Sequence, residues 1–497
     1  MTLAEPPPTA PPGAAARVRA ALRAAGIDEG GIADVLGARA PAGLGPAGLG
    51  RRLGGQDPRA ILLRLFLAET SVPVGVVRTA LGAETLDALR TCGLVRVAGG
   101  RVRPCVAIEP IGGLLVTYDR RSRHRAHTAD YVLGPGPVTR RLADLAVPCP
   151  RGRVLDLGCG SGTLALLSAA AGATVTGVDV NPRAIAFARF NAALNALDDV
   201  ELLVGDLFAP VAGRRFDRIL CNPPYVVSPA RTYTYRDAAT DVCATIARDM
   251  PAHLAPGGVG QMLANWPCRH GQGCRETPAA WLPDDGADLL VLAGDGLDPV
   301  AYAETWLRQE HADDRVLANE LDAWLAYYRE QDIGWLGEGL VTVHRPVGRA
   351  PWREVRAMPE TSGAAGASIG NLVAARDCLA RCTDDASLLA LRLMAPPGVE
   401  LRERRRAGID GWDAPVFEVV ARRGLRLAVR VDAVGAAIVR RLDGHLTLAE
   451  AAAAVADRAG VDVSALTDGL PSLVRALMQV GLLIPREPIR EPIIAAR

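Results

Sequence analysis

The chain has 497 residues and a formal net charge of +1, so it has room for roughly two to four domains. It carries no global basic field of the kind that binds nucleic acid or an anionic membrane surface, and it contains no lysine, which excludes lysine chemistry. Ten cysteines are scattered without a paired framework, and no apolar run is long enough to span a membrane, so we expect a cytoplasmic protein.

The first part of the chain predicts a helical domain with a winged-helix-like end. Residues 1–12 are rich in proline and are expected to form a disordered tail. The N-terminal domain should cover residues 13–112, with a helix pair and then two strands joined by a glycine turn, at 74–81, 84–89, 93–97 and 101–108. Such a module binds DNA or packs as a cap on another domain, and we favour a substrate-facing cap.

The predicted catalytic domain, residues 113–358, begins with a strand near 113–118. A short basic run follows at Arg120–His127. Its arginines and histidines either form a solvated loop or contact an acidic substrate such as a peptide carboxylate or a phosphate.

The stretch from Val154 to Thr163 reads as a buried strand, a glycine-rich turn and the start of a helix that runs to about Ala171. Glycines at 158, 160 and 162 allow a tight turn and a close approach of the backbone to a ligand at the helix N-terminus. Asp156 stands inside this loop and would repel a pyrophosphate. A ligand with a cationic or polar amino-acid end is therefore favoured.

Three further strands should end at the same edge of the sheet, where open α/β sheets bind ligands. The strand at 174–178 ends in Asp179, which is placed to accept two ribose hydroxyls. The strand at 201–204 ends in Gly205-Asp206-Leu207, where the carboxylate could reach an adenine amino group or cap a helix. The strand at 218–221 ends in Asn222-Pro223-Pro224-Tyr225.

The motifs D-L-G-C-G-S-G, V-D-V-N, G-D-L-F and N-P-P-Y together resemble the class I S-adenosylmethionine-dependent methyltransferases. The resemblance covers about residues 118–346. It is greatest to the amino-methylating, HemK-like branch, which includes protein-glutamine, adenine-N6 and guanine-N2 methyltransferases. It implies an α/β fold, a Rossmann-like sheet with helices on both faces.

The resemblance also implies the cofactor and the site residues. The cofactor is S-adenosyl-L-methionine, and the catalytic residues are Asn222, Pro223, Pro224 and Tyr225. The cofactor-binding residues are Leu133, Gly134, Asp156, Gly158, Gly160, Gly162, Thr163, Asp179, Val180, Asn181, Gly205, Asp206, Leu207 and Asn222. No metal site is expected, because the cysteine and histidine cluster at 268–274 lacks a second ligand pair.

The last part of the chain predicts a linker at 359–370 and a separate domain at 371–497. A strand pair within 416–431 precedes helices near 434–442, 446–459 and 464–480. The pattern Leu442-Asp443-Gly444, a threonine-capped helix, Gly460-Val461-Asp462 and a terminal Gly-Leu-Leu is similar to small winged-helix peptide-recognition domains of the PqqD type. This domain either binds a leader peptide or serves as a structural or dimerising winged helix.

The resemblance implies an enzyme that methylates a planar amide or amino nitrogen of a peptide, a protein or a small metabolite. The alternative is a nucleobase methyltransferase acting on RNA or DNA, which the neutral charge disfavours. A third reading is a non-catalytic, cofactor-binding regulator of DNA. No membrane partner is expected, and the sequence is compatible with a homodimer.

Overall fold

The computed structural model describes residues 5–36, 53–121, 129–229, 236–237, 242–271, 273, 275, 277–283, 286–310, 313–408, 411–467 and 469–486. The chain divides into two compact units. The first comprises 1–142, 149–283 and 293–345, and the second comprises 143–148, 284–292 and 346–497. We describe each unit by itself.

A twisted sheet forms the centre of the first unit, with strands in the order β14-β12-β9-β6-β7-β8. Strands β6 to β9 and β12 run parallel, and β14 runs antiparallel to β12. The strands are β6 Arg153–Leu157, β7 Thr174–Asp179, β8 Glu201–Val204, β9 Phe216–Cys221, β12 Leu254–Arg269 and β14 Ile333–His344. The predicted α/β, Rossmann-like class is therefore confirmed.

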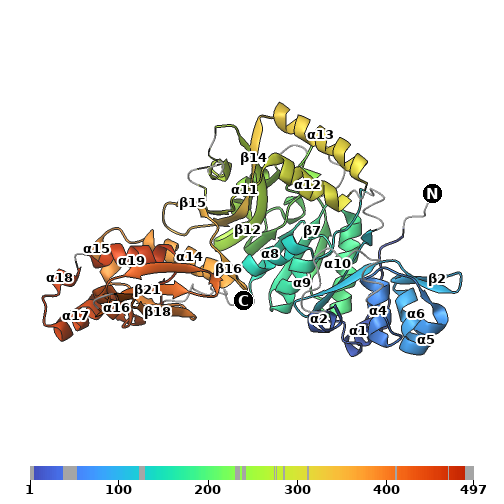
Figure 1. Ribbon diagram of the computed structural model, residues 1–497, viewed down its shortest axis with the longest axis horizontal. Coiled ribbons are helices and arrows are strands. Elements are labelled where there is room, and N and C mark those ends of the chain that lie inside the picture. The colour runs from blue at the N-terminus through green and yellow to red at the C-terminus, as the bar shows by residue number, and fades with distance from the viewer. Residues whose placement is uncertain are drawn as a thin grey trace. The chain divides into compact units, whose positions relative to one another are not determined.

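Helices connect these parallel strands and cover the sheet (Figure 1). In chain order, β6, β7 and β8 are added toward one edge of the sheet, and β9 and β12 are added toward the other edge. Right-handed crossovers therefore place the connecting helices of the two halves on opposite faces of the sheet. The helices are α8 Pro137–Leu145, α9 Thr163–Ala170, α10 Pro182–Asn195 and α11 Val242–His253, with short elements η1 Ala209–Val211, β10 Val226–Val227, β11 Arg236–Asp237 and η2 Thr277–Trp281.

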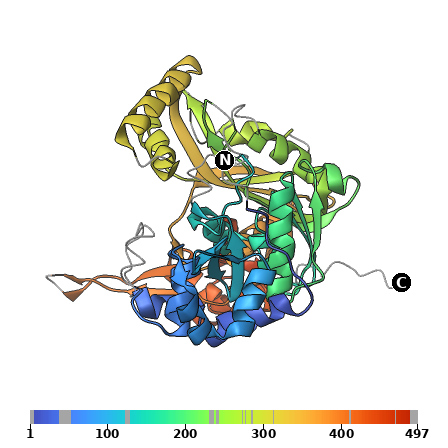
Figure 2. The ribbon, with the colours of Figure 1, turned by 90° about the vertical axis from the view of Figure 1, so that its right-hand side faces the viewer.

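Two further helices, α12 Pro299–Glu310 and α13 Asp314–Glu330, precede β14. They lie together beside that strand (Figure 2). Trp324 and Tyr328 of α13 are buried one helical turn apart, so this helix has a buried apolar face.

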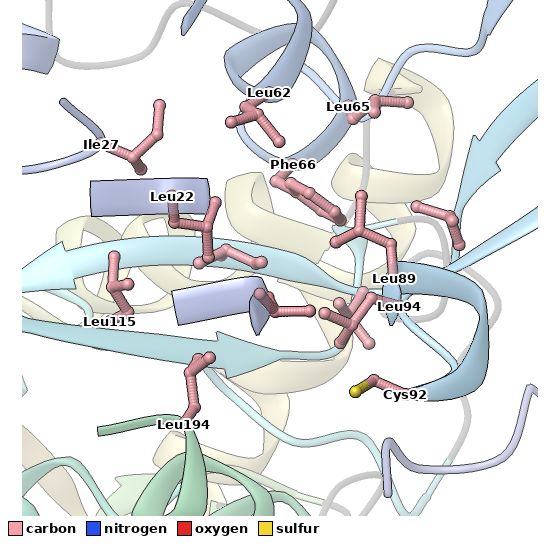
Figure 3. Packing of buried hydrophobic residues seen from close by; sticks show 14 of the residues in the cluster. Leu22, Ile27, Leu62, Leu65, Phe66, Leu89, Cys92, Leu94, Leu115 and Leu194 are labelled. Atoms are coloured by element: carbon pink, nitrogen blue, oxygen red, sulfur yellow. The ribbon is translucent and has the colours of Figure 1, made fainter. Parts of the chain in front are cut away.

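The N-terminal helices share one hydrophobic core with α10 (Figure 3). Leu22 and Phe66 pack in the same cluster as Phe187 and Leu194 of α10. The elements are α1 Ala14–Ala24, α2 Glu29–Leu36, α4 Pro58–Phe66, β1 Val72–Pro73, α5 Val74–Leu81, α6 Ala83–Thr91, β2 Val95–Ala98, β3 Arg101–Pro104, β4 Ala107–Ile111 and β5 Leu114–Tyr118. The expected helix pair and glycine-tipped hairpin are present, with β1-β3-β2 as a small sheet.

The proline-rich N-terminal segment is ordered from Glu5 onward, so the prediction of a disordered tail is wrong for residues 5–12. Pro8 is buried, and the backbone N–H of Thr9 donates to the carbonyl of Cys92 at 3.1 Å. The carbonyl of Glu5 accepts from Arg183 Nη1 at 2.8 Å. The composition alone suggests that the conformational entropy of this segment would keep it disordered. These contacts offset the entropy cost of ordering it.

Asparagines of α10 satisfy the backbone of the neighbouring strand β5. Asn195 accepts from the N–H of Leu115 at 2.9 Å and donates to its carbonyl at 2.7 Å. Asn191, one turn earlier, accepts from the N–H of Thr117 at 2.8 Å and donates to its carbonyl at 2.9 Å. The two side chains thus bond to backbone groups of β5, a strand that also pairs with β4.

The second unit contains β13 Asp288–Ala293 next to β15 Arg353–Ala357, and a smaller α+β assembly with its own core. Its three-stranded sheets have the orders β24-β17-β25 and β18-β21-β23. The remaining elements are β16 Thr361–Ser362, α14 Gly366–Leu379, α15 Asp385–Leu389, β17 Arg392–Met394, β18 Val399–Arg404, β19 Ala407–Gly408, β20 Gly411–Trp412, β21 Val416–Ala421, β22 Gly424–Leu425, β23 Leu427–Val431, α16 Ala433–Val439, β24 Asp443–Thr447, α17 Leu448–Ala459, α18 Ser464–Thr467, α19 Leu470–Gln479 and β25 Ile484–Pro485.

Two expectations need correction, one about the segment 359–370 and one about the pairing of cysteines. The segment 359–370 is not a plain linker, because it contains β16 and the first turn of α14, with Gly366 and Ile369 buried. Cys268 is disulfide-bonded, so the expectation of unpaired cysteines fails at this residue. Within the described ranges, no helix has both the length and the apolar character that crossing a membrane requires.

Candidate active site

The ends of four parallel strands meet at one edge of the sheet, as the motif order predicts. Leu157 of β6 pairs with Val178 of β7 on one side and with Cys221 of β9 on the other. Asp179 pairs with Val204 of β8. The loops that begin at positions 158, 180, 205 and 222 therefore leave the same edge, where ligands of open α/β sheets bind.

The glycine loop combines open space with one tightly packed position. Gly158, Gly160 and Gly162 have φ angles of 72°, 54° and 84°. A Cβ at Gly160 would meet nothing within 4 Å, whereas a Cβ at Gly162 would lie 2.9 Å from Cβ of Ala188 in α10. Gly160 therefore leaves the loop accessible to a ligand, and Gly162 allows α9 and α10 to approach closely.

Asp156 braces the beginning of α9 from within the sheet. It is buried, and its Oδ2 accepts from the N–H of Ala165 at 2.8 Å, which caps a helix whose N-cap residue, Gly162, has no side chain. Its Oδ1 finds no hydrogen-bond partner in the described part of the chain. Desolvation raises the pKa of this carboxyl to about 7, opposed by the Ala165 hydrogen bond. Its contact with a cofactor stays a prediction.

The Asp179 carboxylate connects β7 to the glycine loop. Its oxygens accept from the N–H groups of Gly160 and Asn181, each at 2.8 Å. Burial raises the pKa of Asp179, and both hydrogen bonds oppose the shift. The carboxylate retains further lone pairs for the predicted ribose hydroxyls.

The two residues after Asp179 differ in their surroundings. Val180 is 55% exposed, which suits a wall residue beside a ligand. Asn181 is buried, caps α10 by accepting from the N–H of Arg183 at 2.9 Å, and donates to the carbonyl of Asp130 at 3.0 Å. Asn181 therefore holds the loop before α8 against the start of α10.

The loop after β8 is fixed by backbone contacts. The N–H of Gly205 donates to the carbonyl of Asp179 at 3.0 Å, and Leu207 has a φ of 42°. Asp206 is exposed, and its carbonyl accepts from the N–H of Ala209 at 3.0 Å. The predicted contacts of these residues with an adenine ring stay predictions.

Leu133 and Gly134 lie in a segment that a buried ion pair organises. Leu133 is 48% exposed, and Gly134 packs on the ring of Tyr118, where a Cβ would lie 2.6 Å from the ring. Asp119 accepts from the N–H of Val132 at 3.0 Å and from Arg183 Nε at 2.9 Å. The sequence analysis missed this pair, because the two residues are separated by 64 positions.

Asn222 offers an unpaired acceptor at the end of β9. Its Oδ1 is buried and has no hydrogen-bond partner among the residues that the structure describes. Its backbone carbonyl lies beside the glycine loop, 4.0 Å from the position of a Cβ on Gly158. A buried amide oxygen without a partner costs free energy, and this oxygen is available to a donor that arrives with a ligand.

The other three residues of the N-P-P-Y motif form a tight turn that ends in a buried aromatic ring. The carbonyl of Pro223 accepts from the N–H of Tyr225 at 2.8 Å, which leaves its second lone pair for another donor. Pro224 is half-buried and Tyr225 is buried. The Tyr225 ring packs edge-on against Trp306 of α12, with ring centroids 6.1 Å apart. Trp306 was not among the residues predicted from the sequence.

Most of one predicted substrate contact cannot be placed, because residues 122–127 of the basic run lie outside the described residues. Arg120 is described, and its Nη1 donates to the carbonyl of Pro104 at 2.5 Å.

Comparison with known proteins identifies the central segment. Residues 139–272 match the family described as methyltransferase small domain. Residues 24–105 and 373–485 each match a domain family of unknown function.

Three curated relatives each match between 26% and 29% of this chain. A ribosomal RNA small subunit methyltransferase C of Alcanivorax borkumensis is 34% identical over 28% of this chain and 38% of that protein. A ribosomal protein uL3 glutamine methyltransferase of Bradyrhizobium diazoefficiens is 36% identical over 29% and 52%. A release factor glutamine methyltransferase of Gloeobacter violaceus is 36% identical over 26% and 52%. The chain thus spans about half or less of the length of these relatives.

The strand order, the glycine loop and the family match define the central segment as a class I methyltransferase domain. The relatives include two glutamine methyltransferases and a ribosomal RNA methyltransferase, which agrees with the HemK-like resemblance of its four motifs.

Proposed function

We propose that this chain is an S-adenosylmethionine-dependent N-methyltransferase that acts on a planar amide or amino nitrogen of a peptide, a protein or a small metabolite. The observation that carries the proposal is the buried, unpartnered Oδ1 of Asn222, a residue whose backbone carbonyl lies beside the glycine loop. An acceptor of this kind is suited to an N–H donor that arrives with a substrate. The glutamine methyltransferases among the relatives support a protein as the methyl acceptor.

S-adenosyl-L-methionine fits the residues at the strand ends. The open space over Gly160, the Asp179 carboxylate and the buried Asp156 provide a close backbone approach and two anionic groups for its ribose and amino-acid ends. The further residues proposed to line it are Leu133, Gly134, Gly158, Gly162, Thr163, Val180, Asn181, Gly205, Asp206, Leu207 and Asn222. When bound, its sulfonium supplies an electrophilic methyl group.

The protein's own contribution is orientation of the acceptor nitrogen. One hydrogen of a target NH₂ group would be donated to Asn222 Oδ1 and the other to the free lone pair of the Pro223 carbonyl. Both acceptors are neutral and rigid, and together they aim the nitrogen lone pair at the methyl carbon. Orientation of this kind contributes up to about 7–11 kcal/mol to lowering a barrier.

A second candidate is a nucleobase methyltransferase, because a ribosomal RNA methyltransferase is 34% identical to this chain over 28% of its length. Guanine and adenine amino groups present the same NH₂ geometry to Asn222. The formal net charge of +1 favours a protein or small-molecule acceptor. A steep salt dependence of RNA binding would favour the nucleobase reading.

The flanking parts are proposed to act on substrates or partners. We propose that the N-terminal helices and hairpin form a winged-helix-like, substrate-facing cap, and that the C-terminal part is a winged-helix-like module for a peptide or for homodimerisation. A cytoplasmic location is proposed with them.

The experiment that tests the function uses tritiated S-adenosylmethionine and host cell extract separated into protein, RNA and small molecules. Label in protein or small molecules supports the proposal, and label confined to RNA supports the second candidate. The Asn222→Ala variant is the control and should leave every fraction unlabelled. If the wild type binds the cofactor and labels nothing, both candidates fail.

A further inference from the structure

Helices α12 and α13 bring two buried tyrosines to the chain segment that follows the N-P-P-Y motif. The segment carries β10, and both tyrosines contact its residue Val227. Neither helix lies within the matched methyltransferase domain at 139–272. From these contacts we propose that Tyr302 and Tyr328 are positioning residues that fix the conformation of the Asn222 loop for methyl transfer. This inference rests on the proposed function.

The two tyrosine hydroxyls form hydrogen bonds with the backbone N–H and the backbone carbonyl of Val227. The N–H of Val227 donates to the Tyr302 hydroxyl at 3.1 Å. The Tyr328 hydroxyl donates to the carbonyl of Val227 at 2.9 Å. Val227 is only 2% exposed, so its backbone groups have no access to water as an alternative partner.

The Tyr302 hydroxyl is itself held in place. It also accepts from Asn265 Nδ2 at 2.9 Å, and Asn265 belongs to the central strand β12. The hydroxyl therefore joins the sheet, α12 and the segment after Tyr225 in one buried hydrogen-bond network. Both tyrosine side chains are at most 2% exposed, which limits their freedom to reorient.

The same face of α12 also contacts the motif directly. Trp306 follows Tyr302 by four residues, so the two side chains lie one above the other on the helix. Trp306 packs edge-on against Tyr225, and Tyr302 binds Val227, two residues further along the chain. One helix face thus contacts the last residue of the motif and the segment that directly follows it.

Fixed in this way, the loop has little freedom to rotate the Asn222 amide away from an acceptor. Because displacement of a catalytic group by about 1 Å can cost about 10²-fold in rate, loss of either hydroxyl should lower kcat without removing the cofactor contacts. Apart from Asn222, the residues proposed for the cofactor lie on other segments of the chain.

The test compares Tyr302→Phe and Tyr328→Phe with Tyr327→Phe, which makes the same chemical change on the neighbouring half-buried ring of α13. Methyl transfer is measured with tritiated S-adenosylmethionine and whichever extract fraction the wild type labels. Hydrogen exchange of residues 222–229 is measured by mass spectrometry on the same full-length proteins. We expect kcat to fall about 10- to 100-fold in the first two variants, with KM for the cofactor within about 2-fold of wild type. The Val227 amide should exchange at least about 10-fold faster in Tyr302→Phe.

Four outcomes would overturn the inference: an unprotected Val227 amide in the wild type, unchanged kcat in the folded variants, a rise in KM for the cofactor with kcat retained, or an equal loss in Tyr327→Phe. If one of the two variants does not fold, the other variant and the wild-type exchange data decide. If the wild type labels no fraction, the proposed function fails, and the exchange data alone decide whether the hydroxyls hold the segment.

Discussion

The Asp179 carboxylate accepts a hydrogen bond from the backbone N–H of Gly160 at 2.8 Å, so the end of β7 holds the glycine loop that follows β6. A residue expected to bind a ribose therefore also shapes the loop beneath it. The same carboxylate accepts from the N–H of Asn181, which leads into α10.

Replacing Asp179 with Asn should weaken cofactor binding. An amide keeps one acceptor oxygen but opposes the second N–H with its own NH₂ group, and it lacks the charge that strengthens hydrogen bonds to ribose hydroxyls. We expect the Kd for S-adenosylmethionine to rise about 10- to 100-fold by isothermal titration calorimetry. Asp199→Asn, at an exposed acid before β8, is the control. Equal affinities of wild type and Asp179→Asn would contradict the ribose assignment.

Asn222→Ala should lower the rate of methyl transfer without lowering the stability of the protein. The buried Oδ1 has no partner among the described residues, so its removal relieves a desolvation cost of about 1–3 kcal/mol that offsets the lost packing. We expect unchanged or slightly greater free energy of unfolding in urea, together with a loss of about 10²-fold or more in methyl-transfer rate. A large drop in stability would instead identify Asn222 as a structural residue.

Asp156 should make the stability of the cofactor-free protein depend on pH. Desolvation raises the pKa of its carboxyl from 3.8 to about 7 in the folded protein. Between these values the folded state binds more protons than the unfolded state, so this carboxyl's contribution to stability falls as the pH rises through the window and is level above it.

The measurement is urea denaturation of wild type and Asp156→Asn at about pH 5 and about pH 8. The wild type should lose stability relative to the variant at the higher pH. A difference between the two proteins that is the same at both pH values would show that the carboxyl does not titrate in this window.

Asn191→Ala should destabilise the first unit strongly. Asn191 bonds both backbone groups of Thr117 and donates to the carbonyl of Ser161 in the glycine loop at 2.9 Å. Its loss leaves several buried groups unpaired, and we expect about 3 kcal/mol or more of destabilisation in chemical denaturation. Asn319→Ala, at an exposed position of α13, should change stability by less than about 0.5 kcal/mol.

Gly160→Ala and Gly162→Ala should have different consequences although both residues have positive φ angles. The new Cβ at Gly162 lies 2.9 Å from Ala188, whereas the one at Gly160 enters open space. We expect Gly162→Ala to cost more than about 2 kcal/mol of stability, and Gly160→Ala to cost about 1 kcal/mol and to weaken cofactor binding. Thermal unfolding and calorimetry with the cofactor measure the two effects, and a reversed order would contradict the packing assigned here.

Local patterns predicted β6, the glycine loop and α9 because an apolar run, three glycines and an alanine-rich helix follow one another directly. The bounds of β7, β8 and β9 were also close to prediction, since their signals lie within each element. The order of the motifs fixed their common sheet edge, because parallel strands end on the same side.

Other features depend on residues far apart in the chain. Whether residues 5–12 are ordered depends on partners at Cys92 and Arg183, and whether 359–370 begins a helix depends on burial of Ile369. Composition indicated disorder and a linker for these segments, and tertiary contacts outweighed it.

The sequence by itself determined the fold class of the central domain, the edge of the sheet that carries the site and the residues of its four motifs, because each of these follows from local periodicity and turn chemistry. Only the tertiary structure decided how those residues are held. Asn191 reaches Thr117 across 74 positions, and Tyr302 reaches Val227 across 75. No periodic signal encodes such pairings, since they arise when buried backbone groups find partners in the folded chain.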